Sequence, residues 1–126
     1  MGVQPGLAAT IELVVKEGDT AEALRSGDVP MLATPRVVAL AEEATVAALA
    51  GHLEDKATTV GQRVQLDHLL PIPVGVAVRA EAKLESVEGR RLVFTFSVNS
   101  DRGLVAAGKI HRVIVIRDRF IEKANE

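Results

Sequence analysis

Four segments of alternating apolar and polar residues follow one another between residues 58 and 116, and this pattern constrains the fold more than any other feature. Alternation with a period of two is typical of half-buried β-strands. The predicted strands cover residues 58–70, 74–87, 91–100 and 104–116. Glu88-Gly89 and Asp101-Arg102-Gly103 separate the last three and suit tight turns. Because tight turns join antiparallel neighbours, we expect one antiparallel sheet.

The alternation also predicts which side chains of these strands face inward. They are Val60, Val64, Leu66 and His68 in the first strand, Val74, Val76, Val78, Ala80, Ala82 and Leu84 in the second, and Leu92, Phe94, Phe96 and Val98 in the third.

A single long helical pattern precedes these strands. Thr34 is predicted to be its N-cap, Pro35 to occupy the first helical position and Gly51 to follow its end, so that the helix covers residues 35–50. The apolar stripe of this helix is rich in alanine, which lets a helix approach a sheet closely. The stripe comprises Val37, Val38, Ala41, Ala44, Thr45, Ala48 and Leu49.

One more strand is predicted at residues 7–16, followed by a short helical piece that Asp19 and Glu22 cap and that ends near Arg25. The tail, residues 117–126, is charged and is expected to be frayed or weakly helical. The order of strand, helix and four strands predicts an α+β fold, in which a curved five-stranded sheet wraps around one central helix. With 126 residues the chain is expected to form a single domain over 1–126.

Composition argues against several classes of function. The 15 basic and 17 acidic residues nearly balance and Trp and Tyr are absent, which disfavours a nucleic-acid-binding protein. The absence of Cys excludes thiolate metal sites, disulfides and cysteine nucleophiles, and no metal site is expected. No segment approaches the ~20 apolar residues of a membrane span or resembles a signal peptide, so we expect a cytoplasmic protein without membrane association.

Two residues are candidates for acid–base chemistry. Glu42 lies at the edge of the buried helical stripe, whereas Glu43 faces solvent. A carboxylate pressed against apolar surface suits a base or a nucleophile, but a boundary Glu whose head reaches water fits the pattern as well. His68 falls in the inward phase of its strand, where it is either a general acid or base or a hydrogen-bonded core residue.

Thr34 and Gly61 each allow a structural and a functional interpretation. Helix capping alone explains Thr34, although a helix N-terminus also stabilises an anion or oxyanion. Gly61 within a strand indicates a β-bulge, a packing gap or a close approach of the backbone to a ligand. Several arginines either form a solvated face or meet a phosphorylated ligand, namely Arg90, Arg91, Arg112, Arg117 and Arg119.

These segments together resemble the hotdog-fold acyl-CoA thioesterases, and among them the fluoroacetyl-CoA thioesterase group. The resemblance covers roughly residues 29–115. It rests on Met31-Leu32-Ala33-Thr34-Pro35 before an alanine-rich helix with Glu42, on Val60-Gly61 and Asp67-His68, and on Val87-Glu88-Gly89-Arg90-Arg91-Leu92. That group uses a Thr, a Glu eight residues later and a His 34 residues after the Thr, and this spacing is kept by Thr34, Glu42 and His68.

The resemblance implies a role for each of these residues. Glu42 would act as nucleophile or general base toward the thioester carbonyl, and Thr34 would orient it or hydrogen-bond the substrate. His68 would activate water or protonate the leaving thiolate, and the Gly61 N–H would stabilise the oxyanion.

The last strand departs in part from the group's Gly-x-His-x-Arg pattern. In Gly108-Lys109-Ile110-His111-Arg112, Arg112 matches as a substrate-binding residue, whereas His111 stands one position late and is expected to face the other side of the sheet. The aromatic residues that the fluoroacetyl enzyme carries ahead of its Thr are missing here. Acyl specificity is therefore expected to depend on Val29, Met31 and Leu32 at the mouth of the pocket.

The resemblance further implies an obligate homodimer with active sites at its interface, an acyl-CoA substrate, and no cofactor other than the coenzyme A of that substrate. Two alternatives stay open: a non-catalytic acyl-binding or structural hotdog dimer, and a hotdog acyl-CoA hydratase or dehydratase. The identity of the acyl group, the carrier (coenzyme A or acyl carrier protein) and the subunit that supplies each group also stay open.

Overall fold

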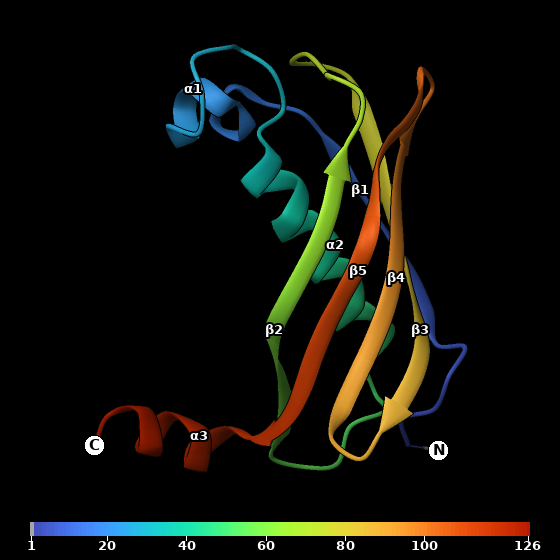
Figure 1. The fold of residues 1–126 in the computed structure, drawn as a ribbon, viewed down its shortest axis with the longest axis vertical. Helices are drawn as coiled ribbons and strands as arrows, with labels where there is room; N and C mark the ends of the chain where they lie inside the picture. Colours follow the sequence, from blue (N-terminus) through green and yellow to red (C-terminus); the bar gives the residue numbers. More distant parts are fainter. Residues whose placement is uncertain (1) are drawn as a thin grey trace.

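Five antiparallel strands form one curved sheet in the order β1-β3-β4-β5-β2 in the computed structural model, which describes residues 2–126 (Figure 1). The strands are β1 (Ala8–Val14), β2 (Ala57–His68), β3 (Ala77–Glu88), β4 (Arg91–Ser100) and β5 (Gly103–Ile116). The helices are η1 (Glu17–Asp19), α1 (Ala21–Leu24), α2 (Thr34–Ala48) and α3 (Arg117–Ala124). The predicted five-stranded α+β architecture is thus confirmed, and the predicted strand 91–100 has the same bounds as β4.

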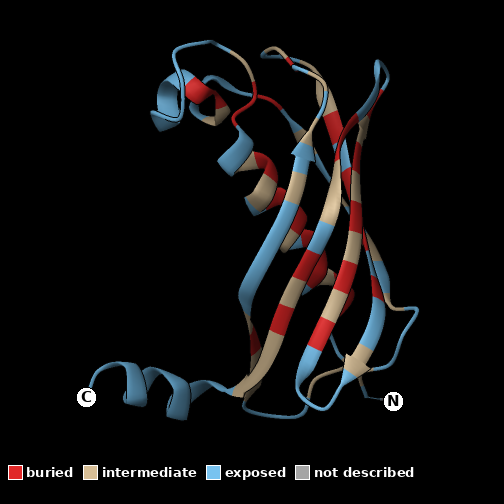
Figure 2. Cartoon of the chain, in the orientation of Figure 1, coloured by how far each residue is buried: buried red, intermediate tan, exposed pale blue. Residues whose placement is uncertain are grey.

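The core lies between α2 and the sheet. The helix packs mainly against β1 and β3 and buries one stripe that includes Val37, Leu40 and Ala44. Along β4 buried residues alternate with less buried ones, as Figure 2 shows, and Phe94 is fully buried. Burial of a large apolar side chain stabilises a fold by about 1.5–3 kcal/mol. The inward phases predicted for residues 74–87 and 91–100 are therefore confirmed within β3 and β4, whose inward residues build the core. The phase predicted for β2 is different from the observed one.

The middle of β2 is exposed to solvent, because α2 packs mainly against β1 and β3. Because α2 lies toward β1 and β3, residues 61–65 of β2 are all exposed, and Val64, which was expected to be buried, is 37% exposed. The predicted bulge is present, since the pairing of β2 with β5 shifts between Gly61 and Arg63. That bulge reverses the phase of the strand, so that buried Thr59 faces inward in place of Val60. The prediction for Val60 was wrong for this reason.

Three further details correct the predictions. Val74 was expected to face inward but is 44% exposed, because β3 begins only at Ala77. In α2, Leu40 is buried, whereas Val38, which was expected in the buried stripe, is only partly buried. Thr20, rather than Asp19 with Glu22, caps α1, because its hydroxyl accepts from the Ala23 N–H.

The ends of α2 also differ from the prediction. Ala33 is the N-cap and the helix stops at Ala48 instead of continuing to residue 50. Thr34 is the first helical residue and makes no capping bond, because its hydroxyl is engaged elsewhere. An ion pair between Arg36 and Asp19, at 2.9 Å, ties this end of α2 to η1. The charged tail forms α3, which projects from the body of the protein (Figure 1).

Candidate active site

Thr34 and His68 meet at one end of the molecule. Thr34 opens α2 and His68 closes β2, and the antiparallel crossing of the two elements brings Thr34 Oγ1 within 2.8 Å of His68 Nδ1. The other ring nitrogen, Nε2, is buried and has no hydrogen-bond partner among the described residues. Burial lowers the pKa of His68 below its usual 6.5 and outweighs the opposite effect of the Leu70 backbone. The imidazole is therefore neutral near pH 7 and is able to accept a proton.

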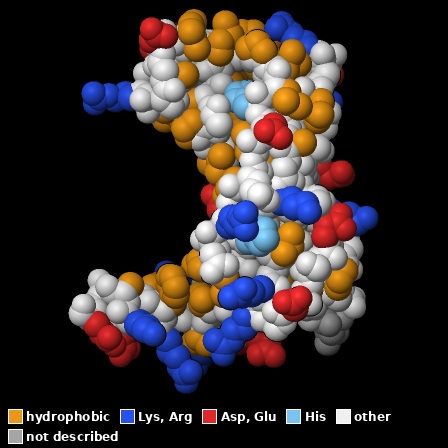
Figure 3. Space-filling model, in the orientation of Figure 1, with side chains coloured by type: hydrophobic (Ala, Val, Ile, Leu, Met, Phe, Trp, Pro, Cys, Tyr) orange, Lys and Arg blue, Asp and Glu red, His pale blue; other side chains and the backbone are white. Residues whose placement is uncertain are grey.

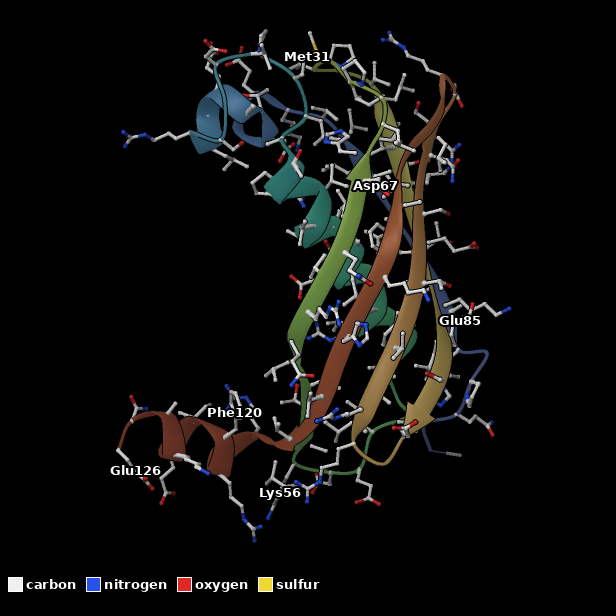
Figure 4. The ribbon with its side chains drawn as sticks, in the orientation of Figure 1. Met31, Lys56, Asp67, Glu85, Phe120 and Glu126 are labelled. Atoms are coloured by element: carbon white, nitrogen blue, oxygen red, sulfur yellow. The ribbon has the colours of Figure 1, made fainter. Side chains whose placement is uncertain are left out.

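A pocket of about 390 Å³ surrounds this pair. Val29, Met31 and Leu32, which the sequence analysis placed at the mouth of a substrate pocket, lie in its wall together with Leu69 to Pro71. Figure 4 shows Met31 in the segment that leads into α2, beyond the end of β2 that carries Asp67. Most of the wall residues are apolar, and Ser26 and Asp28 add polar groups, so this pocket suits a small, largely apolar group next to a histidine.

A second cluster centres on Glu42, in the middle of α2. Its Oε2 accepts a hydrogen bond from Arg112 Nη1 at 3.1 Å, and its side chain remains 34% exposed. Arg112 reaches inward from β5 with only 7% of its side chain exposed. Its burial lowers the pKa of Arg112, and the adjacent Glu42 opposes that shift. An arginine keeps its charge under such conditions, so the pair is a partly buried ion pair.

Gly61 lies directly against this carboxylate. A Cβ at position 61 would overlap Glu42 Oε2 and lie 3.5 Å from Arg112 Nη1. In the β2–β5 pairing Gly61 is also the partner of Arg112, so the bulge, the arginine and the carboxylate form one unit. The β-bulge expected at Gly61 is present. The group that closely approaches the Gly61 backbone is the side chain of Glu42, a residue of the protein itself.

The four residues predicted as one constellation thus form two separate pairs within the chain: Thr34 with His68, and Glu42 with Gly61. No hydrogen bond joins the two pairs among residues 2–126. His111 lies on the face of β5 opposite to Arg112, because adjacent strand residues point to opposite faces, in agreement with the expectation.

Thr59 is the site residue that sequence reasoning missed. Its hydroxyl accepts from Arg112 Nε at 2.9 Å, and its carbonyl accepts from Arg112 Nη2 at 3.0 Å. A threonine in a strand carries no functional signal by itself. Its role follows from the bulge and from the register of β2 against β5, and the spacing along the sequence reveals neither.

Two features are absent from the part of the chain that the structure describes. Within residues 2–126, no group of three or more His, Asp or Glu side chains is arranged to hold a metal ion. None of the helices described is long and apolar enough to cross a membrane.

Comparisons with known proteins show which family the chain is similar to. The family described as fluoroacetyl-CoA-specific thioesterase (FlK) matches residues 15–118. The fluoroacetyl-CoA thioesterase of Streptantibioticus cattleyicolor is 31% identical over 96 residues, which are 76% of this chain and 69% of that protein. A solved structure of the fluoroacetyl-CoA thioesterase FlK has a TM-score of 0.91 at 29% identity, covering 99% of this chain and 97% of that one. A Thermus thermophilus hypothetical protein of the thioesterase superfamily has a TM-score of 0.89 at 27% identity, with 97% and 90% covered.

The curved sheet around α2 is therefore the hotdog fold of these thioesterases, and the protein is a thioester hydrolase. Within that class the chain belongs to the fluoroacetyl-CoA-specific thioesterase family.

Proposed function

We propose that this protein hydrolyses an acyl-CoA thioester, with Glu42 acting at the thioester carbonyl. The observation that carries the proposal is the position of the Glu42 carboxylate, which lies against the Gly61 backbone and is held there by Arg112. If the thioester carbonyl binds beside Gly61, the Glu42 carboxylate lies next to its carbon and is able to act as nucleophile or base. Membership of a thioesterase family supports the class of reaction.

The proposed chemistry divides between the two pairs of residues. An oxygen nucleophile adds to the thioester carbonyl, and the C–S bond then breaks with its electron pair leaving on sulfur. Glu42 serves either as this nucleophile, giving an anhydride that water cleaves, or as the base that deprotonates the attacking water. The Gly61 N–H stabilises the negative charge that develops on the carbonyl oxygen. Where Glu42 is the nucleophile, the thiolate leaves first, and neutral His68 then takes a proton from the water that cleaves the anhydride and passes it to the released thiolate. Where Glu42 is the base, the proton that it takes from water passes through His68 to the departing thiolate. Thr34 orients the ring through Nδ1.

One protomer holds the two pairs too far apart to act on the same carbonyl. Thr34 and Glu42 are eight residues apart, which is about 12 Å along a helix axis. Catalytic groups act at about 3 Å from the reacting atoms. We therefore infer a homodimer in which each active site takes Thr34 and His68 from one subunit, and Glu42 and Gly61 from the other.

The edge strand β2 supports this arrangement. Its residues 61–65 are exposed, and its outer edge is unpaired. In Figure 3 the outline of the molecule is indented on one side, between the α1 region and the projecting α3. Two β2 strands that pair antiparallel about a two-fold axis near residues 64 and 65 would place His68 opposite Gly61 of the partner subunit.

The experiment that tests the activity is a series of acyl-CoA substrates with a thiol-trapping reagent. The protein contains no Cys, so it contributes no background to the signal. Glu42→Gln is expected to lower kcat/KM by at least about 100-fold, the effect of losing a positioned base or nucleophile. The matched control is Glu43→Gln, one residue away on the exposed face, which is expected to be nearly silent. Equal effects of the two substitutions would contradict the assignment of Glu42.

A further inference from the structure

Thr59 is a buried polar residue whose two oxygen atoms both face Arg112. It precedes Gly61 by two residues in β2 and is 9% exposed. Its hydroxyl and its carbonyl accept hydrogen bonds from Arg112 Nε and Nη2, at 2.9 and 3.0 Å. Nη1 of the same guanidinium donates to Glu42 Oε2 at 3.1 Å. All three nitrogens of the guanidinium group therefore have a partner, and Thr59 supplies two of those partners.

The planarity of the guanidinium group makes this contact directional. Because its nitrogens form a rigid fork, holding two of them on Thr59 fixes the direction of the third. Arg112 has only 7% of its side chain exposed, so water does not offer an alternative set of acceptors. Glu42 is 34% exposed and belongs to a helix, and without a fixed donor its carboxylate has freedom to turn toward solvent.

We infer that Thr59 is a positioning residue for the thioesterase reaction: it holds Arg112 so that Arg112 keeps the Glu42 carboxylate against Gly61. This inference rests on the proposed function of Glu42. Without the Thr59 hydroxyl, the Arg112 Nε–H is left buried without an acceptor, and such a donor reorients to find one. The carboxylate then loses its place beside Gly61, although Thr59 itself contacts only Arg112 and not Glu42.

The test compares three single variants in the full-length protein. Thr59→Val keeps the shape of the side chain and removes only the hydroxyl group, whereas Thr59→Ser keeps the hydroxyl group. The matched control is Thr58→Val, because Thr58 is the neighbour in β2 and points to the opposite face of the strand. We expect Thr59→Val to lower kcat by about 10-fold, the effect of losing a hydrogen bond to a charged group, with KM changed less than about twofold. Thr59→Ser and Thr58→Val are expected to keep kcat within about twofold of the wild type.

A double-variant comparison separates positioning from a structural role. In a Glu42→Gln background, Thr59→Val is expected to cause no further loss of kcat, because the group that it positions is already removed. A merely structural role of Thr59 predicts the same fractional loss in both backgrounds, and that result would overturn the inference. Arg112→Lys offers a second route if Thr59→Val folds poorly. A lysine keeps the charge but cannot bond Thr59 twice and Glu42 once, so the same loss of kcat is expected, and an unchanged kcat would also overturn the inference.

A spectroscopic measurement distinguishes this inference from the proposed function. The ¹⁵N–¹H signal of Arg112 Nε is expected to exchange slowly with water in the wild type and in Thr59→Ser, and to be lost in Thr59→Val. An unchanged signal in Thr59→Val would show that Thr59 does not hold Arg112, whatever the activity. One outcome would separate the two claims: full activity of Glu42→Gln together with an Nε signal that depends on Thr59. This result would contradict the proposed role of Glu42 and would still show that Thr59 holds Arg112.

Discussion

Glu42 Oε2 occupies the space that a side chain at position 61 would need. Gly61 does not adopt a positive φ, so a glycine is not required there by backbone conformation. The requirement is steric, because the carboxylate and the Arg112 guanidinium fill the position above the Gly61 backbone. The Glu42 carboxylate therefore fits in its place only because position 61 has no side chain. Any larger residue at position 61 displaces the carboxylate.

Gly61→Ala is expected to lower kcat strongly while the protein stays folded. The atom that the new Cβ meets is the end of a flexible Glu side chain, which moves aside at little cost. Displacement of a reacting group by about 1 Å costs up to about 100-fold in rate, and we expect a loss of this order. The measurement is kcat in the thiol-release assay, together with the thermal melting temperature.

Two other glycines provide controls for Gly61→Ala. A Cβ at Gly108 would overlap the backbone carbonyl of Gln65, which cannot move aside, so Gly108→Ala is expected to destabilise the fold by about 1–3 kcal/mol. A Cβ at Gly18 meets nothing within 4 Å, so Gly18→Ala is expected to change neither stability nor rate. A Gly61→Ala variant that melted like Gly108→Ala would contradict a role limited to the carboxylate.

The pH dependence of kcat/KM is expected to follow His68 on the acidic side. Its buried ring has a pKa below 6.5, so the neutral form, which accepts a proton, persists at pH 6.5 and is lost only at lower pH. We expect kcat/KM to fall below pH 6.5 and to be nearly constant from there to pH 7.5. His68→Gln is expected to be slower and to lose this acidic limb, and an acidic limb above pH 6.5 would contradict the prediction.

The same shift predicts that acid destabilises the fold. Because the folded state binds a proton at His68 less readily than the unfolded chain does, the unfolded state gains protons first as the pH falls. The contribution of neutral His68 to stability is therefore complete above pH 6.5 and is lost as the pH falls through its lower pKa in the folded state. Urea unfolding at pH 7 and pH 5 is expected to show a smaller loss of stability for His68→Gln than for the wild type.

Mixed dimers test the subunit composition of the active site. Thr34→Ala and Glu42→Gln are each expected to inactivate the homodimer. If Thr34 of one subunit works with Glu42 of the partner subunit, a heterodimer of the two variants contains one site in which both residues are intact. Random exchange of subunits is then expected to restore about a quarter of the wild-type rate, because half of the dimers are mixed and each has one active site of two.

An active site built within one subunit gives the opposite result, because every subunit in the mixture lacks one of the two residues. Sedimentation equilibrium at micromolar concentration is the accompanying control. A monomer would contradict the homodimer and with it the composite site.

The alternation of the sequence was sufficient to predict the sheet, because β3 and β4 follow the simple rule of buried and exposed faces. The helix was predicted from Pro35 at its start, Gly51 after its end and its apolar stripe. The rule failed in β2, where the bulge at Gly61 reverses the phase and residues 61–65 are all exposed to solvent. Glycine in a strand indicated the bulge. Which of Thr59 and Val60 faces inward depends on the position of the extra residue in the bulge, and the sequence does not give that position.

The sequence suggested which residue types form the candidate site, but it did not predict how they are arranged. The helix-start pattern predicted that Thr34 caps the helix. In the structure its hydroxyl makes no capping hydrogen bond and instead contacts His68, a residue 34 positions away. The role of Thr59 depends on three elements, α2, β2 and β5, meeting at Arg112. Such contacts between distant segments are set by the register of the strands, which a single sequence does not encode in its local pattern.

We expect this protein not to discriminate strongly for fluoroacetyl-CoA over acetyl-CoA. Selectivity between such similar acyl groups needs a closely shaped, dry pocket, because small apolar differences contribute only about 1–3 kcal/mol. The pocket beside His68 has aliphatic walls and a segment with Ser26, Gly27 and Asp28. None of the three Phe residues lies in it: Phe94 and Phe96 belong to the core, and Phe120 lies in α3 at the other end of the molecule (Figure 4).

The measurement is the ratio of kcat/KM for the two substrates, followed across a series of longer acyl groups. Met31→Ala is expected to change the relative rates across this series, since Met31 lies in the wall of the pocket. The matched control is Ile121→Ala in α3, an exposed apolar side chain far from the pocket, which is expected to leave them unchanged. A ratio above about 1,000 in favour of the fluorinated substrate, or about 4 kcal/mol, would contradict the prediction, because an aliphatic and partly polar wall offers no group able to produce it.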